Sequence, residues 1–198
     1  MKLTRPGLWA GVAVALVFTL VALAEFWMGR LWICKCDKVL LWYGYTNGSG
    51  NSQHLSDWYS FTHVIHGFMF YGLLRLFFRK LPVSIRLILT IILEGAWEVF
   101  ENTSFTIERY RAGTIALDYY GDSIINSLSD IVFCIFGFIL ARKFPVKVSL
   151  AFVIALEIGL GILVHDNLTL NIVMLPFPIE SVKNWQATPA LVPFSPPE

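Results

Sequence analysis

Five long apolar stretches, separated by more polar segments, set the hydrophobic pattern of this chain. Each has close to the ~20 residues that a helix needs to cross about 30 Å of hydrocarbon. They cover approximately residues 8–28, 60–78, 84–102, 121–141 and 146–165. The pattern predicts an all-α membrane protein, a bundle of about five transmembrane helices. We expect one integral-membrane domain over residues 1–185 and a flexible Pro-rich tail over residues 186–198.

The first stretch has two interpretations. It follows the basic residues Lys2 and Arg5, and it contains Ala22-Leu23-Ala24, which resembles a signal-peptidase site. It is therefore either an uncleaved anchor or a signal peptide removed after Ala24. We favour the anchor, because apolar and aromatic residues continue beyond Glu25 through Phe26-Trp27-Met28.

Basic residues indicate the orientation of the bundle, because cytoplasmic loops of membrane proteins carry an excess of lysine and arginine. The segments predicted to be cytoplasmic contain Lys2, Arg5, Arg75, Arg79, Lys80, Arg86, Arg142, Lys143 and Lys147. The opposite loops, residues 29–59 and 103–120, are longer and mixed in charge. We therefore expect a cytoplasmic N-terminus and a periplasmic C-terminus, whether or not the first stretch is removed.

Composition agrees with a membrane location and narrows the function classes. The 198 residues are 56% hydrophobic and 15% charged, whereas a soluble domain carries roughly 25% charge. The net charge of +1 offers no basic stripe for phosphates, so we expect no nucleic-acid partner. Three cysteines are too few for a disulfide scaffold. Cys34 and Cys36 favour a labile disulfide or a weak metal motif that could include His54.

The polar centre of the chain lies in the stretch from Asp118 to Asp130, which opens the fourth apolar segment. Asp122, Asn126 and Asp130 are spaced i, i+4 and i+8, which places them on one side of a helix. A carboxylate inside a membrane helix is costly and usually faces the bundle interior at a functional site.

Two other apolar segments carry matching polar stripes. His63 and His66 are spaced i, i+3, and Glu94, Glu98 and Glu101 are spaced i, i+4 and i+7. A helical rise of about 1.5 Å per residue places His66, Glu98 and Asp130 roughly 18–20 Å from the nearest cytoplasmic arginines. The spacing therefore predicts an outward-facing polar pocket shared by three helices.

These residues allow several chemical roles. Glu98 or His66 could act as general base, while Asp122 and Asp130 could orient water. Arg109 and Arg111 could hold an anionic head group. Further substrate-binding candidates are Ser123, Asn126, Glu101 and Asn102. A divalent metal, if one binds, would take ligands from His63, His66, Glu94, Glu98 and Asp130.

Each signal also has a structural interpretation. The two histidines could be interfacial and bonded to neighbours, and the glutamates could form a buried network that only fixes packing. Asp122 and Ser123 could cap the fourth helix, since both residue types accept hydrogen bonds from free N–H groups there. Arg109 and Arg111 could be ordinary loop charges.

Several segments together resemble one family of bacterial membrane proteins. They are Ile33–Cys36, Asn51–Tyr59, His63–Phe68, Trp97–Asn102, Arg109–Arg111, Asp118–Asn126 and Asp166–Asn171. On these the chain is similar to the uncharacterised UPF0314 (DUF2585) family, which implies a multi-pass protein of the bacterial inner membrane and no particular reaction. A looser similarity to VanZ-like membrane proteins would give corresponding places to His66, Glu98, Arg109 or Arg111, Asp122 and Asn126.

Two functions follow as hypotheses. The first is an envelope enzyme, or enzyme-like protein, that acts on an amphiphile such as a phosphorylated lipid or lipid-linked intermediate. The second is a non-catalytic binding, assembly or transport-accessory protein whose buried polar network is structural. Membrane lipids are the expected partners in both.

Overall fold

The computed structural model describes residues 5–46, 48–114 and 119–192, and helices are the only regular secondary structure among these residues. The helices are α1 (Arg5–Trp27), α2 (Ser60–Phe77), α3 (Val83–Glu101), α4 (Ser104–Gly113), α5 (Ile124–Lys143), α6 (Val146–Leu163), α7 (Leu168–Met174) and α8 (Glu180–Gln186). Lys2, Asp118 and the last residues of the tail lie outside the described residues. The five long helices coincide with the five apolar stretches within a few residues.

Three of the long helices, α1, α5 and α6, are long and apolar enough to cross a membrane over Leu8–Trp27, Ile124–Lys143 and Val146–Leu163. The other two, α2 and α3, carry the histidines and glutamates, which lower their hydropathy. The outer sides of α1 and α6 expose a row of large aliphatic side chains, among them Leu16, Leu20, Ile154 and Ile158. Such surfaces are typical of helices that face lipid.

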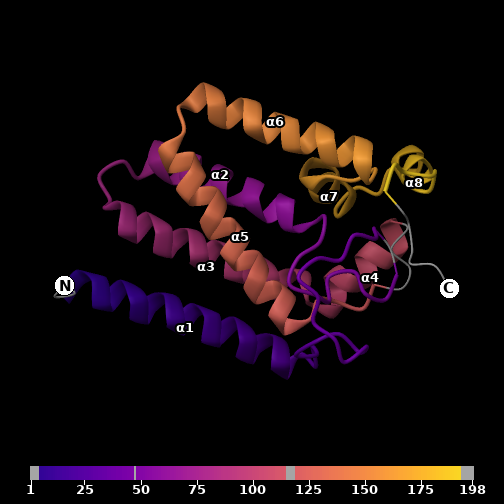
Figure 1. Ribbon diagram of the computed structural model, residues 1–198, viewed down its shortest axis with the longest axis horizontal. Helices are drawn as coiled ribbons and strands as arrows, with labels where there is room; N and C mark the ends of the chain where they lie inside the picture. Colours follow the sequence, from indigo (N-terminus) through magenta and orange to yellow (C-terminus); the bar gives the residue numbers. More distant parts are fainter. Residues whose placement is uncertain (1–4, 47, 115–118, 193–198) are drawn as a thin grey trace.

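Helix α5 is at the centre of the bundle. It packs most extensively against α2 and also contacts α1, α3 and α6. Figure 1 shows α5 crossing the other long helices obliquely, with α4, α7 and α8 gathered at one end. One apolar core joins α2 to α5 through Val64, Phe68 and Phe138, and a second joins α1, α3 and α5.

Close contact between α2 and α5 depends on two glycines that face each other's helix backbone. A Cβ atom at Gly67 would lie 2.1 Å from the carbonyl oxygen of Cys134, and one at Gly137 would lie 2.1 Å from that of Val64. Both positions therefore require glycine at the present helix separation. The same crossing places His63 of α2 opposite Asp130 of α5.

The segment between α1 and α2 covers the N-terminal end of α5. The N–H groups of Ile124 and Ile125, which have no partner within the helix, donate to the carbonyls of Leu31 (2.8 Å) and Trp32 (3.2 Å). The Asn126 side chain donates to the carbonyl of His54 (2.8 Å), and Ser123 N donates to the carbonyl of Ser52 (2.9 Å). We call residues 28–46 and 48–59, which lie outside the helices, the outer cap.

Helix α1 continues through Ala24 and contributes Val21 and Glu25 to the buried interior. Whether the first span is retained in the mature protein stays a prediction.

Candidate functional site

Two histidines of α2 share a single carboxylate of α3 in the bundle interior. His63 Nδ1 lies 2.6 Å from Glu94 Oε1, and His66 Nδ1 lies 2.9 Å from Glu94 Oε2. All three side chains are buried, and Glu94 has no exposed surface. The i, i+3 spacing of the histidines lets both rings turn toward the same acid.

Two further acids complete the cluster around His63. Glu98 Oε1 lies 3.2 Å from His63 Nδ1, and Asp130 Oδ2 of α5 lies 3.7 Å from His63 Nε2. The second oxygen of Asp130, Oδ1, is buried with no hydrogen-bond partner. We call His63, His66, Glu94, Glu98 and Asp130 the histidine–acid cluster.

A cleft with a cavity volume of about 90 Å³ opens onto this cluster from the end covered by the outer cap. This is room for several waters or one small polar group, since a water needs about 10–15 Å³ by the same kind of measure. The cleft is lined by His63, His66 and Asp130 but not by Glu94 or Glu98. The two glutamates therefore lie behind the histidines, and the two imidazole rings face the cleft.

Aromatic rings border the histidines and limit access to them. Trp97 packs edge-on against His66, with ring centroids 5.6 Å apart, and the two imidazoles are themselves perpendicular at 5.3 Å. The cleft walls also carry Tyr59, Tyr110 and Tyr119. The site thus has a polar floor, and its walls combine these aromatic rings with polar side chains.

Asp122 belongs to a second group of hydrogen bonds, above the cluster. It accepts hydrogen bonds from Asn102 Nδ2 (3.0 Å) and from the Tyr119 hydroxyl (2.9 Å), and its own N–H donates to Asn102 Oδ1 (2.8 Å). Asn102 also donates to Ser127 Oγ (3.2 Å). Asp122 still lines the cleft, so it can contact a molecule that enters.

Of the remaining predicted site residues, some line the cleft and others make hydrogen bonds that hold the helices in place. Glu101 and Asn126 line the cleft. Ser123 is the N-cap of α5, accepting from the Asn126 N–H at 3.3 Å, as the structural interpretation had it. Asn102 is fully buried in its bonds to Asp122 and α3.

Arg109 and Arg111 do not reach the histidine–acid cluster. Arg109 donates to the carbonyls of Leu175 (2.6 Å) and Pro176 (3.0 Å), and Arg111 donates to the carbonyl of Tyr119. Neither residue lines the cleft. Their guanidinium groups join α4 to neighbouring segments, and we assign them no ligand-binding role.

Three acids that sequence reasoning did not select also belong to this end of the molecule. Asp57 accepts from the N–H groups of Ser52 and Tyr59, and burial raises its pKa. Asp166 accepts from the Tyr59 hydroxyl at 3.2 Å, and burial raises its pKa to about 7. Glu25 of α1 is fully buried. For Glu25 the signal was available, because it is an acid inside an apolar helix.

Comparison with known proteins places the chain in a family. A family profile described as "Protein of unknown function (DUF2585)" matches residues 25–188. The chain belongs to the DUF2585 family. The match takes in the whole histidine–acid cluster, the outer cap and α4, α7 and α8.

Curated relatives of this DUF2585 protein carry the name UPF0314. One from Rhizobium meliloti (strain 1021) is 51% identical over 94% of each chain. One from Paracoccus denitrificans is 49% identical over 88% of this chain and 91% of its own, and one from Brucella anthropi is 42% identical over 89% and 91%. No solved structure matches. The family resemblance expected from the sequence is confirmed, while the likeness to VanZ-like proteins stays a prediction.

Proposed function

We propose that this protein is an enzyme of the bacterial inner membrane that acts on an amphiphile by acid–base chemistry at the histidine–acid cluster. One observation carries the proposal: two imidazoles, backed by a shared buried carboxylate, face a cleft that also contains Asp130. A carboxylate behind a histidine fixes the tautomer and orientation of the ring and stabilises its protonated form. Such a pair is suited to taking a proton from water or a hydroxyl and returning it.

The roles follow from position. His63 and His66 face the cleft and would exchange protons with the substrate, and Glu94 would position both rings. Asp130, whose Oδ2 lies 3.7 Å from His63 Nε2 and whose Oδ1 has no hydrogen-bond partner, would orient a water molecule or the substrate hydroxyl. Glu98, first considered as a base, lies behind His63 and would help to set its charge instead.

A lipid or lipid-linked substrate is supported by the position of the cleft. The tyrosine and tryptophan rings in its walls can pack against an apolar chain, while its floor is polar. In the bundle of five spans that we propose, this end faces the periplasm. A reporter enzyme active only outside the cytoplasm tests the topology: we expect activity when it is fused after Gly113 and none after Lys80, and the reverse result would refute it.

A divalent metal is the alternative use of the same residues. Single ligand atoms of His63, His66 and Glu94 all lie within 4.8 Å of one another, and ligands about 2.1 Å from one ion lie roughly 3–4 Å apart. However, the 2.6 Å and 2.9 Å contacts to Glu94 are hydrogen-bond distances, shorter than the separation of two ligands on one ion, so each imidazole is positioned to donate its Nδ1–H to this carboxylate. The present geometry therefore favours proton sharing.

The test uses full-length protein in nanodiscs and an extract of inner-membrane lipids as the probe. We expect mass spectrometry to reveal an amphiphile that the wild-type protein converts and that H66Q and D130N convert at least about 100-fold more slowly. E108Q is the matched carboxylate-to-amide control for D130N, because Glu108 is exposed on α4.

Two results would refute the proposal. If the variants fail to accumulate in the membrane while E108Q does, the network is structural, as in the non-catalytic hypothesis. If the wild-type protein is stable but converts the lipids of the extract no more than H66Q does, catalysis on a lipid is excluded. A stoichiometric metal ion in the purified protein would favour the metal alternative.

A further inference from the structure

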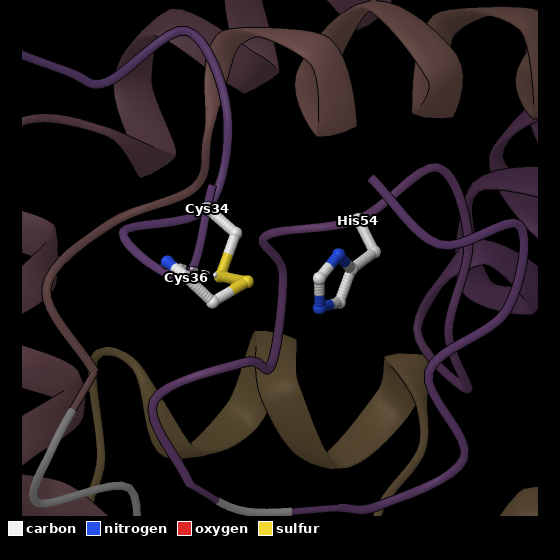
Figure 2. Close-up of side chains that lie close together, drawn as sticks. All are labelled: Cys34, Cys36 and His54. Atoms are coloured by element: carbon white, nitrogen blue, oxygen red, sulfur yellow. Dashed lines mark hydrogen bonds between the residues drawn. A yellow bond between two sulfur atoms is a disulfide. The ribbon is translucent and has the colours of Figure 1, made fainter. Parts of the chain in front are cut away.

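The outer cap contains a second group of reactive side chains, separate from the histidine–acid cluster. Cys34 and Cys36 form a disulfide, and Figure 2 shows the imidazole of His54 beside it. One atom from each of the three side chains lies within 4.8 Å of the other two. The cluster is assembled from two parts of the cap, since Leu40 N donates to His54 Nδ1 at 3.3 Å.

This disulfide contributes little as a cross-link. A disulfide stabilises a fold mainly by closing a loop in the unfolded chain, and the gain grows with the length of that loop. Here only Lys35 separates the two cysteines. The cap is instead held by backbone hydrogen bonds, including Tyr43 N to the carbonyl of Ser56 (2.8 Å) and Leu55 N to that of Leu40 (3.0 Å).

The two sulfur atoms are in different environments. Cys36 is exposed, whereas Cys34 is only 4% exposed. The N–H of Cys36 donates to Cys34 Sγ at 3.1 Å. A hydrogen bond from an amide stabilises negative charge on sulfur, so Cys34 is the better leaving group and Cys36 the accessible point of attack.

His54 can support the same charge distribution. Its Nδ1 accepts a hydrogen bond, so the neutral ring carries its proton on Nε2 and can donate to a thiolate. Burial lowers the pKa of His54, which keeps the ring neutral at pH 7. Lys35 adds a cation to the same turn, with its ammonium 4.1 Å from the centre of the Tyr120 ring.

We propose that Cys34 and Cys36 form a thiol–disulfide exchange centre that oxidises a dithiol in a partner polypeptide. A thiolate of the partner attacks Cys36 Sγ, the Cys34–Cys36 bond breaks, and its electron pair passes to Cys34 Sγ. The second thiolate of the partner then attacks the partner's first sulfur, the bond between that sulfur and Cys36 Sγ breaks, and its electron pair passes to Cys36 Sγ. The partner leaves with a new disulfide, and Cys34 and Cys36 keep the two electrons and take up two protons as thiols.

The test compares the full-length oxidised protein with an oxidised hexapeptide of residues 33–38, using a reduced two-cysteine peptide as substrate. We expect the protein to oxidise the substrate at least about 10-fold faster than the hexapeptide, because only the folded cap supplies the His54 environment and the buried Cys34. A rate equal to that of the hexapeptide would overturn the proposal, and this comparison needs no variant to fold.

Variants then assign the two sulfurs. Given the oxidised form of the substrate peptide, the free Cys36 thiolate of C34S should attack the peptide disulfide and hold one peptide cysteine in a mixed disulfide, detected by mass, while the other peptide cysteine leaves as a thiolate; C36S should form no such adduct. H54Q should slow exchange and shift its pH profile, whereas a merely structural role would lower stability and leave the profile unchanged. Cys134 is the internal control, because it is buried in α5 and should stay unmodified. Trapping on Cys34, or slow exchange with stoichiometric zinc binding by the reduced protein, would overturn the proposal.

Discussion

The sharpest stability prediction concerns the crossing of α2 and α5, where Gly67 and Gly137 touch the opposite backbone. In G67A the new methyl group would lie 2.1 Å from the carbonyl oxygen of Cys134 and 2.5 Å from Phe138 N. Carbon–oxygen contacts between helices normally have about 3.3 Å. The two helices would therefore have to separate by about 1.2 Å at this point, because neither neighbour is a side chain that can rotate away.

Overpacking of this kind costs about 1–3 kcal/mol, and the rigid neighbours favour the upper end. Replacing glycine by alanine inside a helix returns about 1 kcal/mol. The net loss in G67A should be about 2 kcal/mol, which corresponds to a drop in melting temperature of about 4–8 °C for a chain of this size. G137A should behave similarly, because its methyl group would lie 2.1 Å from the carbonyl oxygen of Val64.

The matched control is G72A on the same helix, where an added methyl group meets nothing within 4 Å. It keeps the propensity gain without the clash, so it should melt at or slightly above the wild type. Melting can be followed by intrinsic fluorescence of the purified proteins in nanodiscs. If G67A melts as high as G72A, the helices are not held together by this contact, and the placement of His63 opposite Asp130 loses its structural basis.

Two further predictions concern the end of the bundle that the outer cap covers. Burial raises the pKa of Asp166 to about 7, and an unfolded aspartate titrates near 3.9, so the folded protein keeps a proton that the unfolded chain loses. The free energy of unfolding should therefore fall as pH rises between about 4 and 7 and level off above pH 7. D166N should flatten this slope in melting curves. A wild-type stability that rises between pH 4 and 7 would contradict the raised pKa of Asp166. S123A removes the N-cap of α5 and the hydrogen bond to the Gln53 carbonyl (3.1 Å), which should cost about 1 kcal/mol or slightly more in chemical unfolding. S84A, at an exposed position of α3, should change the free energy of unfolding very little. Equal losses of stability in S123A and S84A would refute the importance of Ser123 as the N-cap of α5.

The long helices were predictable because length and hydrophobicity alone define them. Prolines sharpen two of the boundaries: Pro82 precedes α3 and Pro145 precedes α6. The shorter helices α4, α7 and α8 were not predicted, since ten residues or fewer show too little periodicity.

The histidine–acid cluster was partly visible in the sequence. Helical spacing shows which side chains share a face, so the approach of the polar stripes of α2, α3 and α5 could be anticipated. The residue count grouped His66 with Glu98 and Asp130, whereas His63 lies beside those two acids and His66 pairs with Glu94. Hydrogen-bond partners could not be anticipated. Arg109 binds the carbonyls of Leu175 and Pro176, and backbone carbonyls carry no sequence signal. Asp166 was not expected beside Tyr59 either, because the two residues are 107 positions apart and the sequence does not show which loops meet.

The contacts of Leu31 and Trp32 with the start of α5 have a consequence for biogenesis. During synthesis Leu31 and Trp32 emerge well before Ile124 and Ile125. Their carbonyls accept hydrogen bonds from the amide N–H groups of these two residues. The outer cap therefore cannot make these contacts until α5 has been synthesised. Closure over the cleft must be a late step of assembly, completed only after most of the polypeptide has left the ribosome.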